Sequence, residues 1–187
     1  FRGSFLQEVV FEGAKSLGNY AFKGCTELKK VTMGEGLSKI GTETFEGCLQ
    51  LQTVELPYSV SKIGVGAFAN CKELTNVDLD PVKPGTGDRL IGEGAFYNCK
   101  LGNLNFGSTS LGTIGKGAFA TDMPGSDGLT QVDMSKTGFT TIEDQAFSGR
   151  SALKTIIMPG EYGSTAAATL PENVFAGCIN LERVEFP

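Results

Sequence analysis

The chain has 187 residues, 40% of them hydrophobic and 20% charged, and this composition indicates a folded protein with a substantial core. Its net charge of -5 argues against nucleic acid or an anionic membrane surface as a partner, because both attract clusters of Lys and Arg. The sequence also has no histidine, the commonest general base and metal ligand, and no apolar run of the ~18 residues that a membrane span needs.

One apolar pattern recurs from end to end, and the stretch IGVGAFANCKELTNVDL at residues 63–79 shows it most completely. Counted from a Phe, the pattern has an apolar residue at -5, Gly or Asn at +2, Cys at +3, Leu at +6, Val at +9 and an apolar residue at +11. Successive Phe residues are 23 or 28 positions apart, and such a period is typical of a repeat protein. They are Phe22, Phe45, Phe68, Phe96, Phe119, Phe147 and Phe175.

Three repeats depart from the pattern. The fourth lacks one residue, the fifth gains four and has Asp122 at the Cys position, and the sixth has Arg150 there. We expect residues 1–187 to form a single domain of about seven repeats of 23–28 residues plus an N-terminal half repeat. Because the first residues fall within a repeat, we also expect a fragment of a longer protein. The half repeat covers 6–11 and the full repeats cover 17–33, 40–56, 63–79, 91–106, 114–134, 142–158 and 170–186.

Each repeat predicts one strand and one tight turn. In the LxxVxL segment, the Val and the last apolar residue are two apart, so they share one face of a strand. The residues at -1, 0 and +3 share one side of a single helical turn. Gly and Asn at +2 tolerate the left-handed conformation that ends such a turn, and Thr121 is the exception. A lone repeat is too short to bury its own core, so the repeats must stack.

Two longer additions, residues 80–89 and 159–169, both fall between a strand and the next apolar residue at -5. They are rich in Pro and Gly, so we interpret them as loops. Since they occupy the same phase of the repeat, we expect them to project from one edge of the stack.

The stretches IGVGAFANCKELTNVDL, IGTETFEGCLQLQTVELP and AFKGCTELKKV resemble the 23-residue leucine-rich repeats of the BspA-like, Treponema-pallidum-type family. The resemblance implies a leucine-rich repeat solenoid: a curved right-handed stack with a parallel β-sheet on the concave face and short turns or 3-10 segments on the convex side. Asp122, Arg150 and the irregular spacing between 96 and 170 depart from the family pattern, so we expect less regular curvature there.

The resemblance also implies a non-enzymatic bacterial protein that is secreted or displayed at the cell surface and binds other molecules, in some relatives host matrix proteins. The N-terminal FRGSFLQEVVF lacks the basic-then-apolar layout of a signal peptide. A signal or anchor is therefore expected outside this chain.

Five cysteines allow three interpretations. A zinc site is disfavoured, because four thiolates spaced ~4.8 Å apart along a line do not converge on one ion. Disulfides between neighbouring repeats are within reach of the alpha carbons, but side chains stacked in parallel rarely meet the torsion requirement. We favour buried, reduced thiols that act as small hydrophobic residues. The cysteines are Cys25, Cys48, Cys71, Cys99 and Cys178.

No group of residues indicates an enzyme, a cofactor site or a firm metal site. Three Gly-x-Gly pairs, beginning at Gly64, Gly92 and Gly115, share one repeat phase and are better explained by turn geometry than by phosphate binding. Glu55 and Asp78 would lie on adjacent strands, but an open sheet lacks the cleft that glycoside hydrolysis requires. Asp78 and Asp80 form only a weak cation candidate, since no fixed loop or full ligand set accompanies them.

The residue between the Val and the last apolar position points out of the core and forms a polar, mainly acidic stripe along the sheet. This stripe has two interpretations, a merely solvated face or a surface for a basic protein patch or a glycan. The stripe has no aromatic residue at its centre, which favours a protein ligand over a glycan. A structural spacer in a larger surface protein is a further alternative. The candidate ligand-binding residues are Thr32, Glu55, Asp78, Asn105, Asp133 and Glu185.

Overall fold

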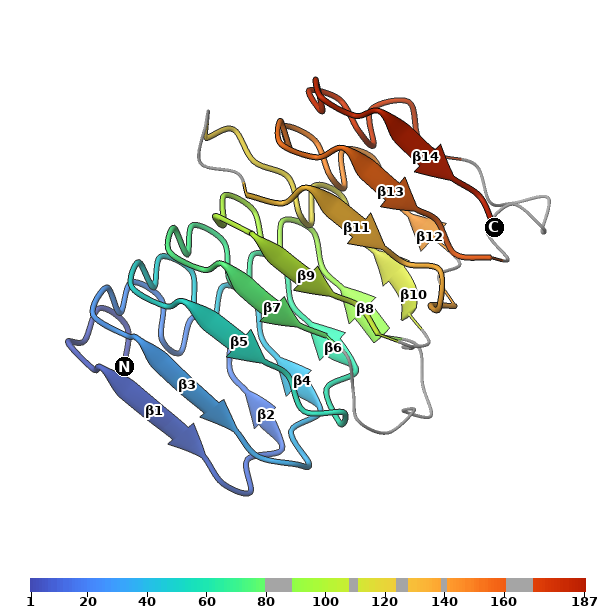
Figure 1. The fold of residues 1–187 in the computed structure, drawn as a ribbon. Helices are drawn as coiled ribbons and strands as arrows, with labels where there is room; N and C mark the ends of the chain where they lie inside the picture. Colours follow the sequence, from blue (N-terminus) through green and yellow to red (C-terminus); the bar gives the residue numbers. More distant parts are fainter. Residues whose placement is uncertain (80–88, 108–110, 124–127, 139–140, 161–169) are drawn as a thin grey trace.

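The protein is a solenoid of short parallel β-strands, and the described residues contain no helix. Figure 1 shows the repeats stacked one after another, with the first and last repeats at opposite ends. The predicted stack of parallel strands is therefore confirmed. The computed structural model describes residues 1–79, 89–107, 111–123, 128–138, 141–160 and 170–187.

One strand per repeat forms at the LxxVxL segment, as predicted, and we call these strands the first strand row. The central Val is buried and its two neighbours are exposed, for example around Val54 and Val77. Neighbouring strands pair in parallel and in register, with Val54 opposite Val77 and Val77 opposite Leu104. The row comprises β1 (Glu8–Phe11), β3 (Lys30–Met33), β5 (Thr53–Glu55), β7 (Asn76–Asp78), β9 (Asn103–Asn105), β11 (Gln131–Asp133), β13 (Thr155–Ile157) and β14 (Arg183–Glu185).

A second row of strands, which the sequence did not predict, forms at the apolar residue at -5. It is a continuous six-stranded sheet, whereas pairing in the first strand row divides into β1-β3, β5-β7-β9 and β11-β13-β14. A strand of two to four residues is too short to show an alternating pattern in the sequence. The second row comprises β2 (Ser16–Leu17), β4 (Lys39–Ile40), β6 (Lys62–Ile63), β8 (Arg89–Ile91), β10 (Leu111–Ile114) and β12 (Thr141–Ile142).

The Phe rings form one file through the interior. Successive ring centroids from Phe22 to Phe147 are 5.1–5.4 Å apart and the rings are nearly parallel. The last step, from Phe147 to Phe175, is 6.1 Å. These distances are close to the spacing of strands in a sheet, so each repeat places one ring on the ring of the preceding repeat.

The turns contain two left-handed positions per repeat, of which only one was predicted. At +2, every repeat except the one with Thr121 has a positive φ, as expected from Gly and Asn. At -2, six residues also have positive φ, including Tyr20 (61°) and Glu43 (50°), which are unusual residue types for this conformation. Gly occupies -2 in only three repeats, and Tyr20, Glu43 and Gln145 in three others hid this position in the sequence.

The Gly-x-Gly pairs serve turn geometry, as predicted. A Cβ added at Gly64 or Gly92 would lie 2.5 Å or 2.7 Å from the backbone of the preceding repeat, and the second Gly of each pair is left-handed. The two predicted loops fall almost entirely on residues 80–88 and 161–169, which lie outside the described residues, as does Asp80 of the weak cation candidate. No helix long and apolar enough to cross a membrane occurs in the described ranges.

Candidate functional site

The predicted stripe residues all lie on the first strand row, and five of the six are exposed while Glu185 is half-buried. The parallel register places Glu55 opposite Asp78 and Asp78 opposite Asn105. Thr32 pairs with Val10, and Asp133 and Glu185 flank Ile157. The structure therefore brings Glu55, Asp78 and Asn105 together in one sheet, whereas Thr32 lies in a second sheet and Asp133 and Glu185 lie in a third.

The three central residues border a shallow polar groove of about 230 Å³ across β5, β7 and β9. The Nδ2 of Asn105 donates a hydrogen bond to Oδ1 of Asp78 over 3.0 Å, and Oδ1 of Asn105 accepts one from the Gly107 amide. Thr53, Asn76 and Asn103 complete the polar lining. The groove thus presents carboxylate and amide groups whose orientation is set by strand register.

A larger cleft of about 460 Å³ lies between β3 and β5, and sequence analysis missed it. Within the sheets of the row, paired amides donate to one carbonyl of the preceding repeat, as Thr75 and Asn76 do to Gln52 over 3.0 and 3.3 Å. No ladder pair joins β3 to β5 among these described residues. Thr53 and Glu55 line both this cleft and the groove, so the two hollows adjoin at β5. Nothing in the repeat pattern distinguishes this junction from its neighbours.

Ion pairs and turn contacts hold the acids at the ends of the row. Arg183 Nε lies 2.8 Å from Oε1 of Glu185, and Lys30 Nζ lies 2.9 Å from Oε1 of Glu8. Asp133 Oδ1 accepts a hydrogen bond from the Ser135 amide. The acidic character of the row is therefore concentrated at its centre.

The centre of the row does not resemble a hydrolytic site. Glu55 and Asp78 are both exposed on an open face, and neither has the enclosed apolar surroundings that general acid catalysis by a carboxyl group needs. No group of three metal-ligating side chains occurs in the part of the chain that the structure describes.

The cysteines are buried thiols, and none forms a disulfide, as the favoured interpretation predicted. Each Sγ donates to the carbonyl of the Phe one repeat earlier, for example Cys71 to Phe45 over 3.2 Å and Cys99 to Phe68 over 3.1 Å. Burial raises the pKa of Cys48 to about 12. At neutral pH such a thiol is protonated, and it is therefore neither a good nucleophile nor a metal ligand.

The stacked parallel strands and the recurring Phe, Cys and Leu positions define a leucine-rich repeat solenoid. The family model for the BspA type leucine-rich repeat region matches residues 1–123 and 86–187 in six copies. The chain therefore belongs to the BspA-type leucine-rich repeat family, as its repeats predicted.

Similar solved structures come from bacterial leucine-rich repeat proteins. The T. pallidum leucine-rich repeat protein is 22% identical with a TM-score of 0.62, over 97% of this chain and 70% of that one. A leucine-rich cell surface protein from Faecalibacterium prausnitzii is 23% identical with a TM-score of 0.43, over 96% and 59%. The pneumococcal vaccine antigen PcpA is 18% identical with a TM-score of 0.48, over 96% and 58%.

The chain thus spans less than two thirds of the F. prausnitzii protein and of PcpA. The likeness to the T. pallidum protein concerns the fold. A search of curated proteins finds no match to the chain.

Proposed function

We propose that this protein is a non-enzymatic interaction module, secreted or displayed at a cell surface, that binds a protein ligand through the first strand row. Thr32, Glu55, Asp78, Asn105, Asp133 and Glu185 would form the binding surface. The observation that carries the proposal is the register of Glu55, Asp78 and Asn105 along one groove, which adjoins the cleft at β5. Membership of the BspA-type repeat family supports a binding role, since its repeats build an extended surface.

The chemistry of the groove fits a basic patch on another protein. Two exposed carboxylates on adjacent strands repel each other, and a Lys or Arg placed between them relieves that repulsion. Rigid strands hold these groups in place before binding, which lowers the entropic cost of association. Opposite charge also speeds encounter, so binding should weaken with added salt.

A carbohydrate ligand is the alternative that the same groove favours. The Asn105 and Asp78 side chains form a polar pair of the kind that hydrogen-bonds sugar hydroxyl groups. Aromatic rings, on which sugars stack, are absent from the candidate residues. For this reason we place a protein ligand, such as a host matrix or cell-surface protein, ahead of a glycan.

A parallel screen against purified extracellular matrix proteins, bacterial surface proteins and a glycan array tests the proposal. The triple variant Glu55→Lys, Asp78→Lys, Asp133→Lys should lose about tenfold or more in affinity for any protein ligand found. The control variant Glu12→Lys, Glu35→Lys, Glu73→Lys makes the same charge change at exposed sites outside the first strand row, and it should retain binding. Sugar-specific binding without protein binding would support the glycan alternative, and equal binding by both variants would support a spacer.

A further inference from the structure

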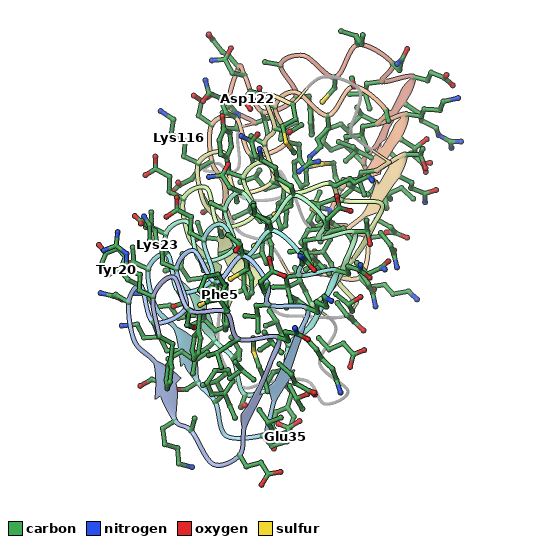
Figure 2. All side chains as sticks on the ribbon, turned by 90° about the vertical axis from the view of Figure 1, so that its left-hand side faces the viewer. Phe5, Tyr20, Lys23, Glu35, Lys116 and Asp122 are labelled. Carbon is green, nitrogen blue, oxygen red and sulfur yellow. The ribbon has the colours of Figure 1, made fainter. Side chains whose placement is uncertain are left out.

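A second hollow lies on the opposite side of the solenoid from the first strand row, over the turns of the third, fourth and fifth repeats. It has a volume of about 350 Å³, and we call it the turn-side trough. Its floor is made by Gly66, Gly94 and Gly117 at -2 and by Ala69 and Ala120 at +1. Figure 2 shows Tyr20, Lys23, Lys116 and Asp122 projecting from this side of the molecule.

The trough exists because large side chains are missing from two repeat positions. The first two repeats have Tyr20 and Glu43 at -2, and Lys23 and Glu46 at +1, in the same turn. The third and fifth repeats have Gly followed by Ala at these positions, and nothing in the fold requires this, since Glu43 adopts the same left-handed conformation. The hollow is therefore a property of this chain's residues and not of the repeat geometry.

The floor of the trough offers apolar surface and no vacant backbone donor. The amides of Gly66, Gly94 and Gly117 donate to the carbonyls of Glu93, Lys116 and Asp144 in the next repeat, over 2.8–3.0 Å. A ligand on this floor gains contact with methyl and methylene groups, and it gains no hydrogen bond to the backbone. That chemistry fits an aliphatic side chain better than a sugar, whose hydroxyl groups would lose water without replacement.

The surroundings of the trough are acidic. Glu43, Glu46 and Glu93 line it together with Lys116, and Lys23 pairs with the first two carboxylates. Tyr97 also lines it, and the Tyr97 hydroxyl donates a 2.8 Å hydrogen bond to the exposed Asp122. This bond lowers the pKa of Asp122, which therefore remains ionised at neutral pH. The trough is thus lined by three carboxylates and one cation, and Glu43 and Glu46 are the two carboxylates paired with Lys23.

We propose that the turn-side trough is a second docking surface, for an extended protein segment that places an aliphatic side chain on the Gly and Ala floor and a neighbouring Lys or Arg beside Glu93. Successive repeats here are 5.1 and 5.3 Å apart, measured between Phe ring centroids. Three repeats therefore accommodate about three residues of extended chain at ~3.3 Å each. This surface acts independently of the first strand row, so the protein would hold two partners at once.

Synthetic octapeptides test the proposal, one alternating Leu and Lys and one alternating Leu and Glu, both blocked at their termini. Titrated into the ¹⁵N-labelled protein, the basic peptide should shift the amide signals of residues 65–69, 93–97 and 116–120, and added salt should weaken the effect. The acidic peptide should leave these signals unchanged. Equal shifts from both peptides, or no shifts in these segments from the basic one, would overturn the proposal.

Variants then separate the contribution of the apolar floor to peptide binding from that of the Glu93 charge. The double variant Ala69→Gln, Ala120→Gln fills the floor without adding charge, and Glu93→Gln removes the exposed carboxylate; each should weaken binding about tenfold. Ala176→Gln is the matched control, because Ala176 occupies the same repeat position outside the trough and should bind as the wild type does. Melting curves check that each variant is folded.

Two further results would decide against the proposal. Wild-type affinity in a folded, floor-filled variant would overturn it, and so would an oligosaccharide that shifts the same residues in place of the peptide. The triple Lys variant of the first strand row should bind the basic peptide normally. Its outcome therefore separates a failure of this inference from a failure of the proposed function.

Discussion

The repeats with Cys and the sixth repeat, which lacks it, supply a hydrogen bond to a buried Phe carbonyl by different means. In the regular repeats, a buried thiol donates to the Phe carbonyl one repeat earlier, as Cys48 does to Phe22 over 3.3 Å. In the sixth repeat, Arg150 replaces Cys and its Nε donates to the carbonyl of Phe119 over 2.6 Å. The comparison shows that a buried donor at this position is not restricted to sulfur, since a guanidinium nitrogen also donates to a Phe carbonyl.

Arg150 also reaches across the repeat before it. Asp122, at the Cys position of the fifth repeat, is exposed and accepts a hydrogen bond from Tyr97, so its side chain lies outside the interior. The Nη1 of Arg150 donates to the carbonyl of Cys99, two repeats earlier, over 3.0 Å. One long side chain, fully buried at 0% exposure, thus donates to two buried carbonyls in two different repeats.

Removing Arg150 should have the largest effect on stability, because two buried carbonyls would lose their hydrogen-bond donor and a cavity would open. We expect Arg150→Ala to lower the free energy of unfolding by about 3–5 kcal/mol, measured by urea denaturation. Arg150→Met keeps most of the volume without the donors, and it should recover part of this loss. A loss below about 1 kcal/mol for Arg150→Ala would show that the guanidinium is not needed.

Raising the pH into the alkaline range should have the second-largest effect on stability, because it ionises the thiols of the regular repeats. Burial raises the pKa of Cys48 from 9.0 to about 12, so the folded state holds the proton while the unfolded chain releases it. The contribution of Cys48 is complete below pH 9.0 and is lost as the pH rises toward 12. Between pH 8 and pH 10.5, Cys48 should account for about 2 kcal/mol of lost stability in urea denaturation. In Cys48→Ala this dependence should be flatter; an unchanged pH slope would contradict the assignment.

Removing a single thiol should cost less than removing Arg150. Cys71→Ala leaves the Phe45 carbonyl without its side-chain donor and creates only a small cavity, so we expect a loss of about 1–2 kcal/mol. Urea denaturation, as for Arg150→Ala, compares directly how much a buried thiol and a buried guanidinium contribute to the free energy of unfolding. If Cys71→Ala cost as much as Arg150→Ala, the view that Arg150 serves two repeats would be wrong.

Removing the exposed hydrogen bond between Tyr97 and Asp122 should have the smallest effect on stability. Tyr97→Phe removes the hydrogen bond that holds the pKa of Asp122 below its ordinary value, so that pKa should rise toward the ordinary value. Side-chain carboxyl titration by NMR measures this change. Because Asp122 is exposed, the melting temperature should hardly change, and an unaltered titration would show that the hydrogen bond does not form in solution.

Much of the candidate site followed from strand periodicity, because alternate residues of a strand point to opposite faces. That rule places Glu55, Asp78 and Asn105 on one exposed face from the sequence alone. It could not find the cleft between β3 and β5, since the two repeats at that junction have the same pattern as their neighbours. It also could not find the contact of Arg150 with Cys99, because the two residues are far apart in the sequence.

The amino-acid sequence alone determined the repeat, its stacking and its exposed face, because recurring apolar residues have no way to be buried except against the same residues of the next repeat. Contacts between repeats in the tertiary structure decided three other features. These are the second strand row, the interruptions in the first strand row, and the hydrogen bond from Arg150 to Cys99. These features depend on how closely one backbone approaches another and on which buried carbonyl receives a donor. Such distances are set by all neighbouring repeats together, so no single repeat encodes them.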